Sequence, residues 1–406
     1  MDSLINSAAR ALSGGDPLAA LNRVALRNDP PALALRGIAM AQLGDLERAR
    51  TLLRAAVRAF GPTESVYRAR CVVAEAEVAL VSRDLGKTLD ELPGARAVLE
   101  AAGDLANGAH AAYLDARRHL LTGHLDHAEA LLSSFDRSGL PLTTRVGCNL
   151  VEAGIAIRRV RARPAHSALE QARRGARKAA IPALAAEVEA TAKSLQAPKA
   201  RILTQCDDRL ASLADVEALF SSGALIVDVC RNVLRAGPTV ISMTNRPVLF
   251  SALRTLAEAW PTDAAREVLL KQIFGARQAD ESHRVRLRVE VARLRKLIVP
   301  LADIRATKAG FVLRPRTNVD IVLLLPPTES EHGAFLALLA DGEAWSSSAL
   351  AEATGMSART VQRAMKLLAG EGAVEPIGQG RSRRWMATPV PGFPTSLLLP
   401  VAGIPR

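Results

Sequence analysis

Aromatic residues and cysteines are scarce in this chain. Phe, Trp and Tyr make up only 3% of the 406 residues, whereas apolar residues make up 49%. The cores must therefore consist mainly of Ala, Leu and Val, as is common in stacked helices, and wholesale disorder is excluded. The cysteines stand far apart and form no CxxC pair: Cys71, Cys148, Cys206 and Cys230. This spacing argues against a disulfide framework and against a cysteine zinc site.

Targeting and membrane segments are also missing from the sequence. The opening residues MDSLINSAAR have neither the basic nor the apolar region of a signal peptide, and no apolar run approaches the roughly 18 residues of a membrane helix. We therefore expect a cytoplasmic protein without a membrane partner. At roughly 100–200 residues per domain, the length predicts two to four domains.

Basic residues outnumber acidic ones. Lys and Arg total 53 against 41 Asp and Glu, which gives a formal charge of +12 and a pI near 10.3. Such a balance favours polyanionic partners, either nucleic acid or an anionic membrane surface. The total charge does not choose between the two.

Residues 1–200 are rich in Ala and Leu, and small residues recur at similar offsets. Two segments carry the pattern, ALRGIAMAQLGDLERARTLLRAAVRAFGP and YLDARRHLLTGHLDHAEALLSSFDRSGLP. Small side chains let antiparallel helices approach closely, and a turn glycine tolerates positive φ. The matched positions are Gly37, Gly44, Ala49, Ala56 and Pro62 in the first segment and Ala116, Gly123, Ala128 and Pro141 in the second. This part resembles a tetratricopeptide array of about five hairpins. A non-repetitive helical bundle is the alternative.

The resemblance implies a concave surface that senses a ligand or docks a partner protein. His119, His124 and His127 surround one predicted turn, and their spacing could bring three imidazoles together. They straddle the turn without an evident fourth ligand, so we interpret them as solvated turn residues and expect no metal. No repeat contains a nucleophile beside a base. We therefore expect neither catalysis nor a cofactor.

The pattern changes after residue 200. Residues 201–223 are interpreted as a connector, and residues 224–316 begin with the strand-like runs ALIVDV and PTVISM. Helices are predicted over Pro247 to Trp260, over Asp263 to Ile273 behind a Thr262 N-cap, and over Glu281 to Ile298. A hairpin that turns at Ala309 and Gly310 follows. Strands, three helices and a hairpin in this order predict a winged helix-turn-helix domain.

Three segments of this domain are similar to the effector domain of OmpR/PhoB-type regulators: NRPVLFSALRTLAEA, VARLRKLI and IRATKAGFVLR. On the third helix the apolar periodicity predicts that Leu287, Val291, Leu294 and Ile298 face the core. The resemblance implies DNA contacts at Arg286, Val289, Glu290, Arg293 and Arg295, and at Thr307 and Lys308 on the wing. Glu290 departs from the family pattern. One interpretation is that its carboxylate accepts a hydrogen bond from cytosine N4. The other is that this module binds DNA weakly and serves partly for dimerisation. A solvated charged helix is the alternative to DNA binding.

The usual receiver domain of that family needs over a hundred residues of alternating strands and helices. Only about fifteen residues separate Asp207 and Asp208 from the next expected strand, so we expect no receiver domain here. Residues 317–328 are interpreted as a linker, residues 329–388 as a second winged helix, and residues 389–406 as a Pro-rich tail. The helices of this second winged helix are predicted over Glu331 to Ala340, Ser348 to Thr354 and Ala358 to Ala369. Its wing strands are predicted over Ala373 to Ile377 and Arg383 to Ala387. The segment LAEATGMSARTVQRAMKLLAGEGAV resembles winged-helix modules of MarR- and IclR-like bacterial regulators.

The third helix of this module has one apolar and one cationic face. Val361, Ala364, Met365 and Leu368 form the predicted buried stripe. The candidate DNA-binding residues are Ser357, Arg359, Thr360, Gln362, Arg363 and Lys366 on the helix and Arg381, Arg383 and Arg384 on the wing. Arg and Gln are the side chains that make bidentate contacts to guanine and adenine. A winged fold used only for protein contact is the alternative.

The sequence therefore predicts a mainly α-helical chain, with a tetratricopeptide-like array followed by two winged helix-turn-helix domains. The expected function is sequence-specific binding of double-stranded DNA for transcription regulation, by a homodimer whose array senses a ligand or a protein partner. Two other functions stay open. One is a plasmid replication initiator or architectural DNA-binding protein, and the other is an adaptor that uses the array for protein interaction.

Overall fold

The computed structural model describes residues 3–82, 84–85, 87–243, 246–274, 281–327, 333–339, 344–354, 356–377, 380 and 383–387. The chain is mainly helical, with some strands. It divides into two compact units: Met1–Arg159, Arg163–Leu195 and Ala334–Arg406 form the first, and Val160–Ala162 and Gln196–Gly333 form the second. No helix of the described ranges combines the length and apolar character needed to cross a bilayer.

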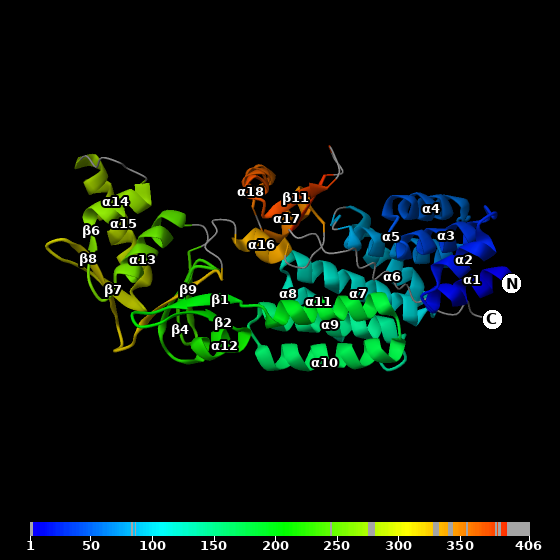
Figure 1. Cartoon of the computed structure of the whole chain (residues 1–406), viewed down its shortest axis with the longest axis horizontal. Coiled ribbons are helices and arrows are strands. Elements are labelled where there is room, and N and C mark those ends of the chain that lie inside the picture. Colours follow the sequence, from blue (N-terminus) through cyan, green and yellow to red (C-terminus); the bar gives the residue numbers. More distant parts are fainter. Residues whose placement is uncertain are drawn as a thin grey trace. The chain divides into compact units, whose positions relative to one another are not determined.

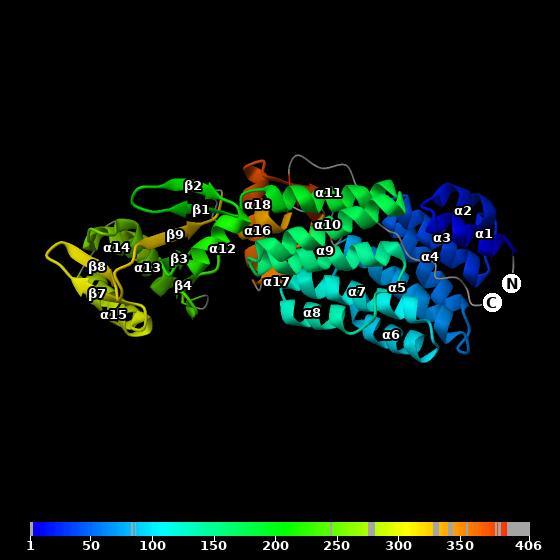
Figure 2. The ribbon, with the colours of Figure 1, turned by 90° about the horizontal axis from the view of Figure 1, so that it is seen from below.

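The first unit begins with a series of helical hairpins (Figures 1 and 2). Each helix from α1 to α9 contacts the next one, and α1 and α3, α3 and α5, α5 and α7, and α7 and α9 also pack together. One helix of each hairpin therefore contacts the corresponding helix of the following hairpin. The helices are α1 (Ser3–Ser13), α2 (Pro17–Val24), α3 (Pro30–Gln42), α4 (Leu46–Ala59), α5 (Ser65–Val81), η1 (Lys87–Glu91), α6 (Leu92–Ala101), α7 (Leu105–Thr122), α8 (Leu125–Ser133), α9 (Leu142–Arg158), α10 (Ala162–Ala179) and α11 (Pro182–Gln196).

Small and turn residues shape these hairpins locally. A Cβ on Gly37 would lie 2.8 Å from Leu53 Cγ, so α3 and α4 approach closely because this position has no side chain. Gly44 and Gly123 have φ values of 88° and 86° at the inter-helix turns, a conformation that L side chains rarely adopt. Asp45 then caps α4, since its carboxylate accepts from Arg48 N at 3.1 Å.

The second unit combines two sheets with four helices among its described residues. Its elements are β1 (Ala200–Leu203), β2 (Asp208–Ala211), α12 (Leu213–Ser221), β3 (Leu225–Asp228), β4 (Val233–Ala236), β5 (Thr239–Ser242), α13 (Pro247–Ala259), β6 (Ala264–Ala265), α14 (Arg266–Phe274), α15 (Glu281–Ile298), β7 (Ala302–Ala306), β8 (Gly310–Pro315) and β9 (Ile321–Leu325). The six-stranded sheet has the order β2-β1-β9-β3-β4-β5, and the three-stranded sheet has the order β6-β8-β7.

The predicted connector and linker belong to the larger sheet. Strand β9, from the 317–328 linker, lies between β3 and β1, parallel to β3 with Ile226 opposite Val322 and antiparallel to β1 with Ile202 opposite Leu324. All five of its residues are buried, because a continuous apolar run must be covered on both faces of a sheet. Strands β1 and β2 and helix α12 occupy most of the 201–223 connector. Both segments are therefore structural parts of the second unit.

The start of α14 also differs from the prediction. Thr262 Oγ1 donates to the Ala259 carbonyl at 2.6 Å, so it turns back to α13 instead of capping the next helix. Ala264 and Ala265 then pair with β8 as β6, and α14 begins only at Arg266. The strand partner is Gly310 and Phe311, more than forty residues away, which local sequence patterns do not reveal.

The C-terminal part of the first unit repeats the arrangement of α13 to β8. Helix α16 (Gly333–Leu339) precedes β10 (Trp345–Ser346), α17 (Ser347–Thr354), α18 (Ala358–Gly370), β11 (Val374–Ile377) and β12 (Arg384–Ala387). The sheet order is β10-β12-β11, so the last strand is again central, as β8 is in β6-β8-β7. We call α13–β8 the middle module and α16–β12 the C-terminal module.

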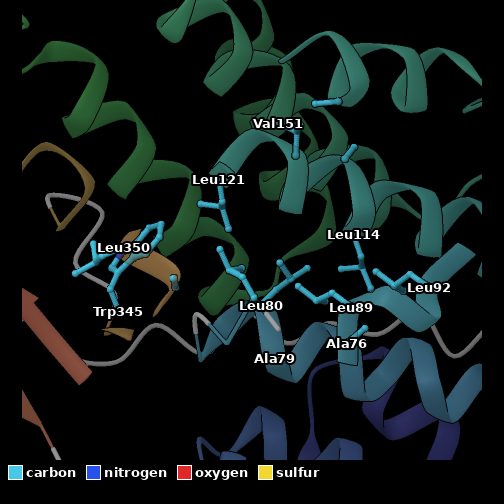
Figure 3. Packing of buried hydrophobic residues seen from close by; sticks show 14 of the residues in the cluster. Ala76, Ala79, Leu80, Leu89, Leu92, Leu114, Leu121, Val151, Trp345 and Leu350 are labelled. Carbon is cyan, nitrogen blue, oxygen red and sulfur yellow. The ribbon is translucent and has the colours of Figure 1, made fainter. Parts of the chain in front are cut away.

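The C-terminal module shares a buried core with the hairpin helices of its own unit. Trp345 and Leu350 belong to the same apolar cluster as Leu80 and Leu121, and Figure 3 shows these side chains together. Trp345 is only 1% exposed. Arg384 Nε on β12 donates to the carbonyl of Ser82, the C-cap residue of α5, at 3.2 Å.

Candidate nucleic-acid interfaces

Helix α15 of the middle module buries the predicted stripe. Leu287, Val291, Leu294 and Ile298 are each at most 2% exposed. Recurrence at i, i+4, i+7 and i+11 keeps these side chains on one face of an α-helix, where they pack in the core of the second unit. The opposite face is accessible to solvent.

Three of the candidate residues on α15 are exposed. Arg286, Val289 and Arg293 lie on the solvent side of the helix, and the side chain of Arg293 is 66% exposed. The guanidinium of Arg286 lies 5.0 Å from the centre of the Phe274 ring at the end of α14. This cation–π contact orients Arg286 while its charge stays at the surface.

Glu290 does not lie on the exposed face with its neighbours. Its side chain is only 13% exposed and accepts from Arg293 Nη1 at 2.9 Å. It lines a groove of about 740 Å³ with the basic side chains of Arg246, Arg293 and Lys296. The expectation that the Glu290 carboxylate projects freely outward was wrong, because it pairs with Arg293 beside the groove between the start of α13 and α15. The carboxylate therefore positions Arg293.

Arg295 and Thr307 support the hairpin β7–β8. Arg295 Nε donates to the Ile304 carbonyl at 2.8 Å, which ties α15 to β7. Thr307 Oγ1 accepts a hydrogen bond from Gly310 N at 2.8 Å and donates one to the Asp263 carboxylate. Arg295 Nε and the Thr307 hydroxyl are thus engaged within the protein, although the Arg295 side chain is still 42% exposed.

Lys308 lies exposed at the tip of the same hairpin. Arg266 holds this tip, since its guanidinium donates to the carbonyls of Thr307 and Lys308 at 2.9 and 2.6 Å. A Cβ on Gly310 would lie 1.8 Å from the Ala264 carbonyl oxygen, so only glycine allows β6 to approach β8 here. The lysine is therefore presented from a rigid turn.

Helix α18 of the C-terminal module begins at a well-formed cap. Ser357 Oγ accepts from Thr360 N at 3.2 Å, and the two hydroxyl groups lie 2.8 Å apart. The predicted stripe Val361, Ala364, Met365 and Leu368 is at most 3% exposed. Ser357 and Thr360, both candidate DNA contacts, thus stabilise the N-terminus of the helix.

Four side chains project from the other face of α18. Arg359, Gln362, Arg363 and Lys366 are all exposed and follow one another at i, i+3, i+4 and i+7. Within the described ranges no carboxylate lies within ion-pair distance of these three cations. The face therefore combines three positive charges with one amide on a single rigid helix.

The wing of this module has one exposed candidate residue and one that is hydrogen-bonded within the protein. Arg383 is exposed, whereas Arg384 is half-buried and donates to Ser82 through Nε. The expectation that Arg384 projects freely from the wing was wrong, because its guanidinium is hydrogen-bonded to the end of α5. Arg381 lies outside the described residues.

Comparison of the chain with protein-family models, with curated proteins and with solved structures found no match. The functional argument therefore depends on this chain's own residues. Its strongest internal feature is the shared topology of the two modules, since each has a helix, a short strand, two helices and a hairpin whose second strand is central.

The three histidines of the α7–α8 turn lie close together. The ring centres of His119, His124 and His127 are 5.4–6.3 Å apart. Burial lowers the pKa of His119, the nearby Asp115 opposes this shift, and the positive charge of Arg118 adds to it. No group of three metal-ligating side chains in the described ranges is placed to hold a metal ion.

Sequence reasoning missed a cavity of about 1010 Å³ among the hairpin helices. Its walls come from the start of α5, the α6–α7 turn and the end of α8 with the segment that follows. The lining residues are spread over some 75 positions without a common motif. No spacing signal in the sequence could have indicated it.

Proposed function

We propose that this protein is a sequence-specific DNA-binding transcription regulator, with a tetratricopeptide-like sensing array and two winged helix-turn-helix modules. The observation that carries the proposal is the outer face of α18. It places Arg359, Gln362, Arg363 and Lys366 on a capped helix without carboxylate partners among the described residues. An α-helix fits the major groove, where Arg and Gln side chains discriminate guanine and adenine.

In the same proposal the middle module has a different role. Arg286 and Arg293 lie on the outer face of α15, and Lys308 lies at the tip of a braced hairpin. Glu290 neutralises part of this charge through Arg293. This module therefore anchors the protein through phosphate contacts, whereas α18 supplies most of the base discrimination.

The shared core of the first unit supports a route for regulation. Because Trp345 and Leu350 pack with Leu80 and Leu121, a change among the hairpin helices alters the support of α18. A ligand or partner that binds the array in one arrangement better than in another would thereby change operator affinity. Homodimerisation and a cytoplasmic location are further parts of the proposal.

Selection from a pool of random DNA duplexes tests the proposal. The full-length protein is expected to enrich a common sequence over successive rounds, with affinity that falls as salt rises. A pool that binds but stays random would overturn sequence specificity and favour an architectural protein. A chain that binds no duplex would favour the protein-interaction adaptor.

A further inference from the structure

The groove between the start of α13 and α15, in the middle module, has a positively charged lining. Its volume is about 740 Å³, and its charged residues are three cations and one carboxylate: Arg246, Arg293, Lys296 and Glu290. Glu290 accepts from Arg293 Nη1 at 2.9 Å, so the charge of Arg293 matches that of the carboxylate. Two positive charges in the lining are therefore left without a counter-charge.

These two charges belong to Arg246 and Lys296, which come from different helices. Arg246 is the N-cap residue of α13, and Lys296 lies in the last turn of α15. Both residues are exposed, and neither side chain forms an ion pair or a hydrogen bond with another described residue. Like charges that line one groove repel each other, and an anion bound there relieves this repulsion.

The backbone at the start of α13 acts in the same direction as the side chains. No side chain caps this helix, and Pro247 in its first turn has no amide hydrogen. The next two residues, Val248 and Leu249, also line the groove, and their amides carry the partial positive charge of a helix N-terminus. The cations determine the sign of the groove, and the helix end adds to it.

The position of the groove on α15 indicates which anion fits it. Arg293 lines the groove and also belongs to the exposed face of α15 that carries Arg286. Seven residues make about two turns of an α-helix, so these two arginines lie on the same side. A helix that enters the major groove lies between two sugar-phosphate strands. With this face toward the bases, the groove beside it lies along one of those strands.

We propose that Arg246 and Lys296 hold one strand of the DNA backbone in this groove through its phosphate groups. The inference rests on the proposed function and deepens it, because it adds two phosphate-binding residues that are not among the candidates from the sequence. A free phosphate ion shares the same chemistry. Duplex DNA has the advantage that each neutralised phosphate releases condensed counterions, so exposed cations bind it more tightly than a single small anion.

Anisotropy titrations of a labelled random duplex with the full-length protein, at a series of salt concentrations, test the proposal. Arg246→Ala and Lys296→Ala are each expected to weaken binding and to lower the slope of log affinity against log salt by about one unit. Arg254→Ala is the matched control, since Arg254 lies on α13 outside the groove lining and pairs with Glu258 at 2.7 Å. The control should leave the slope unchanged. Titration calorimetry with inorganic phosphate is the second arm.

An unchanged slope for either groove variant would overturn the proposal. Saturable binding of inorganic phosphate that Lys296→Ala abolishes, together with an unchanged slope on DNA, would assign the groove to a free anion instead. Thermal melts of each variant separate loss of binding from loss of folding. Because the duplex is random, the test does not depend on base readout. If the unsubstituted protein binds duplex and the groove variants behave alike, the groove assignment fails and the regulator stands. A protein that binds no duplex rejects both.

Discussion

Replacement of Arg363 by alanine tests the central assignment of α18. The side chain is exposed on the outer face of the helix, between Gln362 and the buried Ala364. It forms no ion pair within the described ranges, so its loss removes no contact that stabilises the fold. We expect the free energy of unfolding to change by less than about 0.5 kcal/mol.

The expected effect on DNA binding is much larger. A bidentate contact from arginine to guanine contributes roughly 1–3 kcal/mol of base discrimination. At about 1.4 kcal/mol for each factor of ten, the dissociation constant for the selected site should rise roughly 5- to 150-fold. Affinity for random duplex should fall far less, because it depends mainly on phosphate contacts.

Fluorescence anisotropy with labelled selected and random duplexes measures both values. Arg174→Ala is the matched control, since it removes an exposed arginine on α10, outside both proposed DNA-binding modules. The control should change neither dissociation constant by more than about twofold, a shift of roughly 0.4 kcal/mol. An equal loss on selected and random DNA would show that α18 only anchors the complex. The reasoning about base readout would then be refuted.

The remaining predictions concern the wing and the fold. Lys308→Ala should weaken binding to all duplexes alike and lower the slope of log affinity against log salt by about one unit; an unchanged slope would exclude a phosphate contact. Gly310→Ala should cost more than about 3 kcal/mol in a denaturant titration, because the added methyl overlaps backbone. The lowered pKa of His119 means that the unfolded chain binds more protons below about pH 6.5. Stability should therefore fall as the pH drops through about 6.5, and His119→Gln should flatten that dependence in thermal melts; an unchanged dependence would contradict this assignment.

Local sequence patterns determined the helices and their buried faces. The stripe Leu287, Val291, Leu294 and Ile298 follows from the 3.6-residue period of an α-helix, which needs no knowledge of the partner surface. The Ser357 cap and the positive φ of Gly44 are likewise decided within a few residues. The exposed face of α18 could be predicted for the same reason.

Contacts between distant segments were decided only by the tertiary structure. β9 enters the six-stranded sheet beside β3, about a hundred residues earlier in the chain, so an apparent linker became a central strand. Arg384 donates to the Ser82 carbonyl across 302 positions, and Glu290 lines a groove together with the start of α13. Periodicity places a side chain on a face of its own element. Which neighbour then covers that face depends on packing between elements, and this decided which candidate residues stay exposed.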